Sequence, residues 1–246
     1  MRRRIGVALI ALGVAALVGV GLLVMNELRV RSSYDELAAS VKSEQPDEPG
    51  TDGEQVAIDW DTLRSQNPDI AAWVTMPSAS IDEPVVQTTD NDRYVRHSLW
   101  GEWTLDGCPF LDYRSDADGE NASIYGHHFT NSDTIMFSYL HDAHEQSKFD
   151  TLGEVLYSTP DNGTMTLIPI AAMRVYQNYA PIQTYDWVSV GDWRTWAHDM
   201  ISHNATATSA DWEARLDNST RCVSLICCSE NAAGQPWRAI VICVNG

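Results

Sequence analysis

The sequence predicts a mainly β domain, a closed or nearly closed β-barrel with a few peripheral helices, behind an N-terminal membrane-spanning helix. Short runs rich in Val, Ile, Thr and aromatic residues recur along residues 56–246, and clusters of Gly, Pro, Asn and Asp separate them. Helical patterns are few in this region, and many short strands with few helices are typical of a barrel. An uninterrupted apolar run near the N-terminus supports the membrane-spanning helix.

That apolar run extends from Ile5 to Met25 without a charge or a proline. A helix rises 1.5 Å per residue, so this length crosses a hydrocarbon core of about 30 Å. Arg2, Arg3 and Arg4 precede the run, and the positive-inside rule keeps them in the cytoplasm. A cleaved signal peptide would have a shorter apolar run and small residues at its cleavage site. We therefore expect a retained single-pass anchor in the cell membrane, with the rest of the chain outside.

The segment that follows the anchor, residues 32–55, is rich in Asp, Glu, Ser, Pro and Gly. Apart from a short helical possibility around residues 34–41, this composition cannot bury enough apolar surface to fold. The predicted organisation is therefore a cytoplasmic tail and anchor (1–31), an acidic extracellular stalk (32–55) and one folded domain (56–246).

Within the domain, a short helix is expected after its N-cap Asp59 and before Asn67-Pro68. Further helices are predicted at 134–144 and at 192–203. Turn residues bound each of the expected strands. These strands cover residues 72–76, 84–88, 108–111, 122–125, 154–158, 163–176, 221–227 and 237–244.

Composition excludes some classes of function. The formal net charge is −18, so the chain repels phosphates and a nucleic acid partner is not expected. Five cysteines are an odd number for an exported protein, which leaves at least one thiol free or paired outside the chain. The cysteines form no C-x-x-C pair and have no histidines at zinc-ligand spacing, so we predict no metal site, and no cofactor is expected.

Three residues at predicted strand ends could form a catalytic site. Cys228 ends an apolar strand and begins a polar loop, and Arg238 opens the next strand ten residues later. A hairpin joining these strands makes them antiparallel neighbours, which brings the two residues together. His127 follows the apolar strand 122–125, directly after Gly126. A nearby imidazolium or guanidinium enriches the reactive thiolate, and arginine can stabilise a developing oxyanion.

Taken singly, each of these residues has an ordinary structural explanation. A lone histidine is most often structural, a buried cysteine is usually inert, and an arginine in a strand is usually a surface residue. Their joint arrangement, and motifs that run in order through residues 58–244, favour chemistry. The motifs are IDW at 58–60, NPDIAAWV at 67–74, IDEPVVQ at 81–87, DNDRY at 90–94, GCPFLDYR at 107–114, YGH at 125–127, MF at 136–137 and SLICC at 224–228.

Together these motifs resemble the catalytic domain of class B sortases. The resemblance implies a sortase-type closed β-barrel and a cysteine transpeptidase, and the helix at 192–203 matches the long connection that marks class B. It further implies that the Cys228 thiolate cleaves a C-terminal sorting motif after Thr. A thioacyl enzyme then passes to an amine of the cell wall, with His127 as general acid and base and Arg238 holding the oxyanion. The implied partners are surface proteins with a C-terminal sorting signal, and a peptidoglycan precursor or pilin lysine as the amine.

The sequence departs from the family pattern around the nucleophile. Cys227 and Ser224 stand where the family has threonines, so two cysteines are adjacent. Successive strand residues face opposite sides, so only one can face the site, and the spacing to Arg238 favours Cys228. His128, where the family often has Asn, is interpreted as a polar neighbour. Cys222 and Cys243 could pair across adjacent strands, or Cys222 could simply pack in the core.

Other functions remain open at this point. A pilin-polymerising sortase would use the same chemistry with a pilin lysine, and the absence of a recognisable lid segment in the sequence slightly disfavours it. A non-catalytic anchored β-barrel would serve as a binding module and would tolerate loss of Cys228, His127 or Arg238, yet all three are present. A hydrolytic cysteine peptidase would differ only in resolving the thioacyl enzyme with water.

Overall fold

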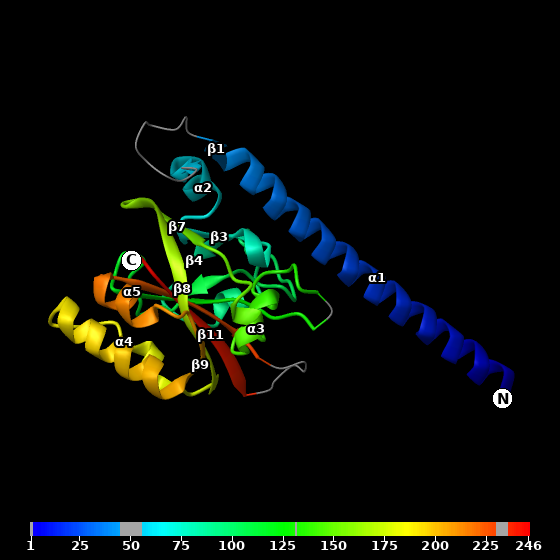
Figure 1. Cartoon of the computed structure of the whole chain (residues 1–246). Helices are drawn as coiled ribbons and strands as arrows, with labels where there is room; N and C mark the ends of the chain where they lie inside the picture. Colours follow the sequence, from blue (N-terminus) through cyan, green and yellow to red (C-terminus); the bar gives the residue numbers. More distant parts are fainter. Residues whose placement is uncertain (1, 45–55, 131, 230–235) are drawn as a thin grey trace.

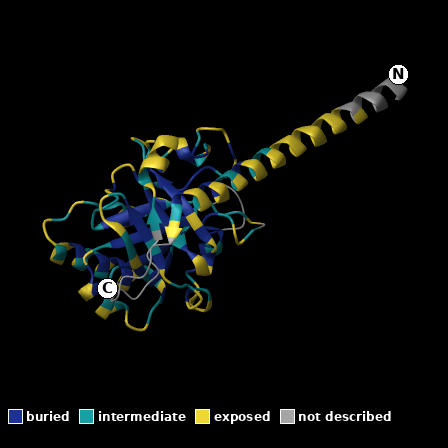
Figure 2. Ribbon diagram, turned by 90° about the horizontal axis from the view of Figure 1, so that it is seen from above, coloured by how far each residue is buried: buried dark blue, intermediate teal, exposed yellow. Residues whose placement is uncertain are grey.

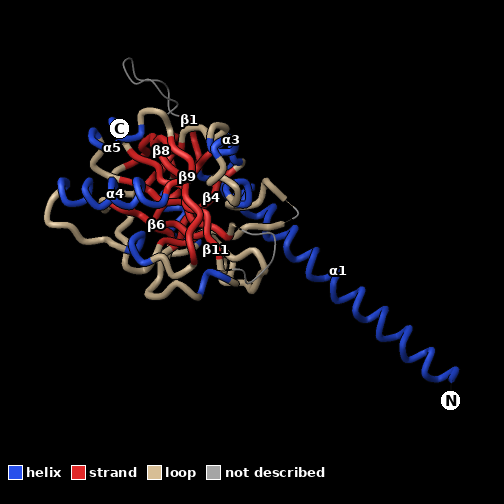
Figure 3. Tube along the Cα trace, turned by 60° about the horizontal axis from the view of Figure 1, so that its bottom comes forward, coloured by secondary structure: helices blue, strands red, loops and turns tan. Residues whose placement is uncertain are grey.

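Strands dominate the domain, as Figure 3 shows. The computed structural model describes residues 2–44, 56–130, 132–229 and 236–246. A small separate sheet pairs β1 (Lys42–Glu44) with β2 (Val56–Ile58). The strands of the main sheet are β3 (Ile70–Met76), β4 (Ile81–Val86), β5 (Phe110–Leu111), β6 (Asn121–Tyr125), β7 (Val155–Thr159), β8 (Gly163–Tyr176), β9 (Ala205–Thr208), β10 (Cys222–Cys228) and β11 (Trp237–Val244).

The main sheet closes on itself. Its strand order is β11-β10-β6-β5-β4-β3-β7-β8-β9, and β8 also pairs with β11. Eight strands therefore form a closed barrel, and β9 extends the sheet from β8. Closure removes the exposed strand edges that invite aggregation. The predicted fold class, a closed barrel with few helices, is confirmed.

Both faces of the β10–β11 region are buried. Val223, Leu225 and Cys227 of β10 belong to the core inside the barrel. The alternate residues Cys222 and Ile226 belong to a second core, which lies between the barrel wall and two helices, α4 (Val190–Asn204) and α5 (Trp212–Asn218). Figure 1 shows these helices on one side of the sheet. Burial on both faces explains why β10 and β11 read as nearly continuous apolar runs.

The N-terminal helix α1 (Arg2–Val41) is continuous through the predicted anchor and beyond it. Figures 1 and 2 show its first half projecting from the domain, and Figure 2 colours the described residues of this half as exposed. Within the described residues, the stretch Leu12–Val41 is long and apolar enough to cross a membrane, and only 6% of its most apolar window is buried. This apolar surface is what a lipid-facing helix presents.

The first part of the predicted stalk is the second half of α1, which confirms the helical possibility around residues 34–41 and extends it toward the N-terminus. Residues 32–41 are helical, and Val30, Tyr34, Leu37 and Val41 are buried in a core shared with the domain. Their spacing of three to four residues places them on one face of a helix, which the acidic composition of the segment obscures. Residues 45–55, the rest of the predicted stalk, lie outside the described residues.

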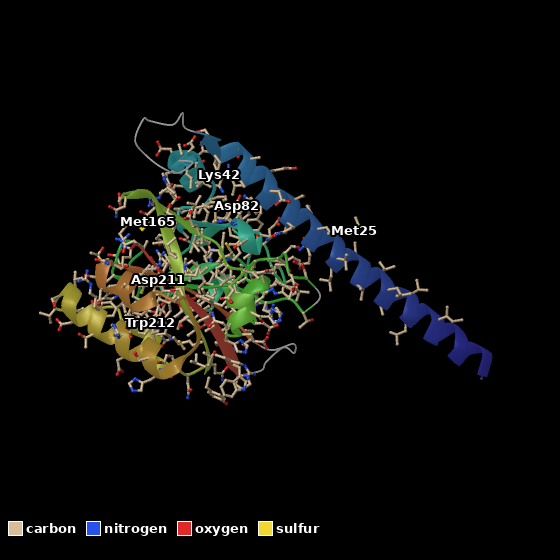
Figure 4. All side chains as sticks on the ribbon, in the orientation of Figure 1. Met25, Lys42, Asp82, Met165, Asp211 and Trp212 are labelled. Carbon is tan, nitrogen blue, oxygen red and sulfur yellow. The ribbon has the colours of Figure 1, made fainter. Side chains whose placement is uncertain are left out.

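Polar contacts fix this half of α1 to the barrel. Nη1 of Arg31 lies 2.6 Å from Oε1 of the buried Glu83. The Tyr34 hydroxyl accepts a hydrogen bond of 2.8 Å from the backbone N–H of Leu99. At the end of the helix, Lys42 pairs with Asp82, two residues labelled in Figure 4. The domain is therefore docked on α1.

Most predicted elements are present. Strands β8 and β11 have the predicted boundaries, and β10 is shifted by one residue from the predicted 221–227, so that it ends at Cys228. Helix α2 (Trp60–Gln66) begins at Asp59, whose side chain accepts a hydrogen bond from Thr62 N. Helix α4 covers the predicted 192–203. Strands β1, β2 and β9 and helix α5 were not predicted.

The predicted helix at 134–144 is wrong. The region holds only the short 3₁₀ turn η3 (Ser138–Leu140), and the four-residue helix α3 (Gln146–Phe149) follows it. Met136 has φ of 48°, which no helix accommodates, and Phe137 N donates a hydrogen bond of 3.2 Å to the His127 carbonyl. This segment is held against the His127 loop, and that tertiary contact overrides the local preference.

Candidate active site

Strand pairing brings the three candidate residues to one edge of the barrel. Strand β6 runs parallel to β10, with Tyr125 opposite Ile226, so His127, two residues after β6, and Cys228, the last residue of β10, lie at the same edge. Strand β11 runs antiparallel to β10 and places Arg238 directly opposite Cys228. Because these positions are fixed by backbone ladders, the site stands on rigid elements.

A pocket of about 160 Å³ lies at this edge. All three predicted site residues line it, each on a strand or within two residues of a strand end. Strands β5 and β6 also contribute to the pocket wall. Phe110 of β5 stacks on Tyr125 of β6, with ring centroids 5.3 Å apart. The lining residues are Val95, Cys108, Phe110, Tyr125, Gly126, His127, Ile226, Cys227, Cys228 and Arg238.

The adjacent cysteines differ in environment. Cys227 is 2% exposed and packs inside the barrel with Leu225, although it also borders the pocket. Burial raises the pKa of the Cys227 thiol well above its usual range, so this sulfur stays protonated at neutral pH. Cys228 lies on the alternate face of β10 and is half-buried. Only Cys228 combines access to solvent with a position opposite Arg238.

His127 is oriented by the backbone. Its Nε2 lies 2.9 Å from the carbonyl oxygen of Val95. A carbonyl oxygen only accepts, so this contact places the ring proton on Nε2 and leaves Nδ1 as the acceptor of the neutral imidazole. Burial lowers the pKa of His127, and the nearby charges of Arg96 and Arg238 lower it further, against the Val95 contact. The free protein therefore holds His127 neutral at physiological pH.

Gly126 is required by the approach of Phe137. A Cβ at residue 126 would lie 2.7 Å from the Phe137 ring. That ring belongs to the barrel core, so it cannot move aside cheaply. The backbone N–H of Gly126 also donates a hydrogen bond of 3.0 Å to Ile226 O, which ties the His127 loop to the Cys228 strand.

The Arg238 guanidinium is held beside the pocket. Nη1 donates a hydrogen bond of 2.9 Å to the Trp237 carbonyl, and Nη2 donates one of 3.3 Å to Gln177 Oε1. Gln177 directly follows β8, the other strand that pairs with β11. A second, smaller hollow lies beside the guanidinium. Gln177 and Tyr179 are among the residues that line it, and Cys228 is not.

The structure assigns the remaining candidates to packing. His128 is not among the pocket-lining residues, and its ring stacks on His141 with centroids 4.2 Å apart. Cys222 and Cys243 are both free thiols. Cys243 lies in the core inside the barrel and Cys222 in the core outside it, so the possible disulfide between them does not form. Among the described residues, no group of three His, Cys, Asp or Glu side chains is placed to hold a metal ion.

Sequence reasoning missed several contributors to the pocket. Val95 acts through its carbonyl oxygen, and a backbone group leaves no mark in residue identity. Gln177 is a polar residue directly after the longest predicted strand, a position that could have drawn attention. Cys108, Phe110 and Tyr125 lie in strands or loops with an ordinary apolar pattern, so only the folded chain shows that they line the same pocket as His127.

Comparison with known proteins places the chain beside sortases. No protein-family model matches it. The chain is 36% identical over 80 residues to sortase B of Listeria monocytogenes, a match that spans 32% of each chain. It is 30% identical over 99 residues to sortase B of Staphylococcus aureus, which spans 39% of this chain and 40% of that one. These alignments therefore span well under half the length of the curated relatives they match.

Solved structures extend the likeness to the whole fold. Sortase B of Bacillus anthracis in complex with AAEK1 aligns with a TM-score of 0.69 at 19% identity, over 91% of this chain and all of that one. A Staphylococcus aureus sortase B–substrate complex aligns with a TM-score of 0.69 at 20% identity, over 89% and 97%. Clostridium perfringens sortase B aligns with a TM-score of 0.64 at 22% identity, over 75% and 98%. The chain therefore has the fold of the class B sortases and resembles them in sequence.

Proposed function

We propose that this protein is a membrane-anchored cysteine transpeptidase of the class B sortase type. It cleaves a C-terminal sorting motif after Thr and transfers the acyl group to an amine of the cell wall. One observation supports this most directly: Cys228, Arg238 and His127 line one pocket at one barrel edge, with Cys228 directly opposite Arg238 in the β10–β11 ladder.

The first half-reaction begins with His127 as a neutral imidazole. Nδ1 of His127 takes the Cys228 proton, and the sulfur attacks the carbonyl carbon of the Thr residue. The Arg238 guanidinium stabilises the oxyanion that forms. The imidazolium then gives its proton to the leaving amine as the C–N bond breaks, which leaves a thioacyl enzyme and neutral His127.

The second half-reaction is the reverse with a new amine. The amine attacks the thioacyl carbon, and His127 removes one of its protons. Collapse of the intermediate forms an amide and expels the Cys228 sulfur, which recovers its proton from His127. Water in place of the amine would give hydrolysis, so the acceptor bound beside the thioacyl group decides the product.

The anchor and the partners complete the proposal. Helix α1 holds the protein in the cell membrane by a single span, with the N-terminus in the cytoplasm and the domain outside, supported by its exposed apolar half and the arginines before it. The protein substrate is a surface protein with a sorting signal, which is supported by the fold it shares with a sortase B–substrate complex. The amine belongs to a peptidoglycan precursor or a pilin lysine.

The test is to incubate the domain with a sorting peptide and a series of amines, and to identify the products by mass. Triglycine, a stem peptide containing diaminopimelate and a pilin-lysine peptide represent the candidate acceptors. We expect slow cleavage with water alone and an amide product with a suitable amine. Hydrolysis products only, across all these amines, would leave a cysteine peptidase as the better assignment.

A further inference from the structure

One loop of the barrel meets α1 where its apolar run ends. Asn26 Nδ2 donates a hydrogen bond of 3.4 Å to the Trp103 carbonyl, and Leu105 N donates one of 2.9 Å to Glu27 Oε1. Arg29 forms an ion pair of 2.8 Å with Glu102. The loop at residues 102–105 is therefore fixed beside the first helical turn after Met25.

This loop exposes large apolar side chains at that level. Trp103 is 51% exposed and Leu105 is 41% exposed. The neighbouring helix is exposed too, with Met25 at 68% and Leu28 at 67%. Isolated exposed apolar residues are ordinary on a protein surface, but these lie next to a helix whose preceding turns are apolar and uncovered.

The depth of the loop follows from helix geometry. The headgroup layer of a bilayer is about 5–8 Å thick on each side, the difference between a core of about 30 Å and a total of about 40–45 Å. Residues 26–29 rise about 5 Å along the helix axis, at 1.5 Å per residue. A span that ends at Met25 therefore places the loop within the headgroup layer, where tryptophan side chains concentrate.

We propose that the loop at 102–105 is a membrane-contact surface, which inserts Trp103 and Leu105 among the lipid headgroups of the outer leaflet. This proposal rests on the membrane anchor proposed above. It adds that the domain lies on the bilayer in one orientation and does not swing on a flexible stalk.

The contacts along α1 support a fixed orientation. Val30, Tyr34, Leu37 and Val41 are buried against the barrel, and the Arg31–Glu83 pair lies among them. The helix that leaves the membrane is thus the helix that carries the domain. Two anchoring points, the span itself and the loop beside it, restrict rotation about the helix axis as well as tilt.

The same chain segment reaches the proposed catalytic pocket. Val95, whose carbonyl holds His127, precedes the loop, and Cys108, which lines the pocket, follows it. The side chain of Arg96, the residue after Val95, donates a hydrogen bond of 2.7 Å to Leu105 O and so ties the Val95 end of this segment to the loop. Membrane contact at 102–105 therefore keeps the pocket wall close to the layer in which membrane-linked substrates reside.

The experiment places the full chain in lipid nanodiscs and measures quenching of tryptophan fluorescence by brominated lipids. The bromine atoms are carried either near the headgroup or near the end of the acyl chains. The predicted span contains no tryptophan, so quenching reports on the domain. We expect headgroup-proximal bromine to quench more strongly than deep bromine, and Trp103→Phe to remove most of that quenching.

Matched controls make the outcome specific. The fluorescence of the Trp212→Phe variant should be quenched as strongly as that of the unaltered chain, because Trp212 lies on the far side of the domain from Met25, as Figure 4 shows. Val14→Trp should be quenched most by deep bromine and so tests the span by itself. Equal quenching in the Trp103→Phe and Trp212→Phe variants would overturn the proposal, even where Val14→Trp confirms insertion. Neither result depends on transpeptidase activity, so a failure here is separate from a failure of the proposed function.

Discussion

The two adjacent cysteines of β10 lie on opposite faces of one strand, and this difference decides which sulfur can react. Cys227 is buried inside the barrel, where the cost of burying a thiolate raises its pKa. Cys228 faces the pocket beside His127 and opposite Arg238. Reactivity of a cysteine follows the stability of its thiolate and its access to substrate, and burial disfavours both for Cys227.

We predict that Cys228→Ala abolishes formation of the thioacyl enzyme, whereas Cys227→Ala or Cys227→Thr keeps most of it. Cys227→Ala leaves a small cavity in the core, so a modest loss of stability is expected in that variant. The measurement is the intact mass of the protein after incubation with a sorting peptide. If Cys227→Ala is the inactive variant, the assignment of the nucleophile is wrong.

Arg238 offers a planar fork of donors that lysine cannot reproduce. We predict that Arg238→Lys lowers kcat/KM by on the order of 10²-fold or more, the scale of losing one oxyanion donor. Arg174→Lys is the matched control, because Arg174 lies on β8 over the Trp237 ring and does not line the pocket. Near-normal kcat/KM in Arg238→Lys would mean that Arg238 does not stabilise the oxyanion and has only a structural role in β11.

His127 should determine the acidic limb of the pH profile. Its lowered pKa keeps the imidazole neutral as the pH falls through about 6.5, the ordinary histidine value. We therefore expect kcat/KM, which reports the free enzyme, to decline only below that pH. Arg96→Gln removes one of the charges that lower this pKa, so the limb should move to higher pH. If the unaltered protein and Arg96→Gln have the same pH profile, the acidic limb does not report the titration of His127.

At the scale of elements, the sequence predicts what local pattern controls. Strands β8 and β11 have the bounds predicted from the sequence, because their long runs of β-branched and apolar residues end at clear turns. Strand β9, an Ala-Thr run, has no such pattern and depends on pairing with β8. The helix expected at 134–144 fails because Met136 and Phe137 pack against the His127 loop. Contacts between distant segments decide these cases.

Some residues of the candidate site could likewise be predicted from the sequence, and others could not. Cys228, His127 and Arg238 could be chosen from residue type and spacing, because reactive side chains at strand ends leave a pattern in the sequence. The carbonyl of Val95 could not, since its role depends on where two loops meet. The helical possibility around residues 34–41 is borne out, but the sequence did not show that this helix continues the anchor and packs on the barrel, because charged residues on its other faces interrupt the buried stripe.

The contact between α1 and β4 should give stability a particular pH dependence. Burial raises the pKa of Glu83 to about 7, although Arg31 opposes the shift. The folded state then binds a proton that the unfolded state has lost, between its unfolded value near 4.5 and about 7. Stability therefore falls as pH rises through this window, by about 3 kcal/mol at most, from roughly 1.4 kcal/mol per pKa unit.

We predict that Glu83→Gln removes this dependence. The variant has no titrating group at the position, so its free energy of unfolding should change less between pH 4.5 and 7 than that of the unaltered protein. Denaturant unfolding of residues 26–246 at several pH values provides the measurement. Asp82→Asn is a nearby comparison, because Asp82 is partly exposed and pairs with Lys42. Parallel curves for the Glu83→Gln and unaltered proteins would contradict the prediction.

At the scale of the whole molecule, two regions have opposite physical demands. The first half of α1 exposes apolar side chains that require lipid, whereas the domain is acidic and requires water. Their junction is a docked helix with buried side chains, so in the proposed membrane-anchored arrangement the bilayer would fix where the domain lies. In that proposed arrangement, substrates confined to the same layer would meet the pocket at a higher effective concentration than they would meet a freely diffusing enzyme.

Topology is the prediction on which this arrangement depends. Arg2, Arg3 and Arg4 should retain the N-terminus in the cytoplasm, because positive charge flanking a span stays inside. Protease added to intact cells stripped of their wall should therefore degrade the domain and spare a short N-terminal tag. Detergent-permeabilised cells are the control, in which the tag must also be lost. Immunoblots against tags at each end distinguish the outcomes. Protection of the C-terminal tag in intact cells would place the domain inside, where neither cell-wall amines nor exported sorting signals could reach Cys228.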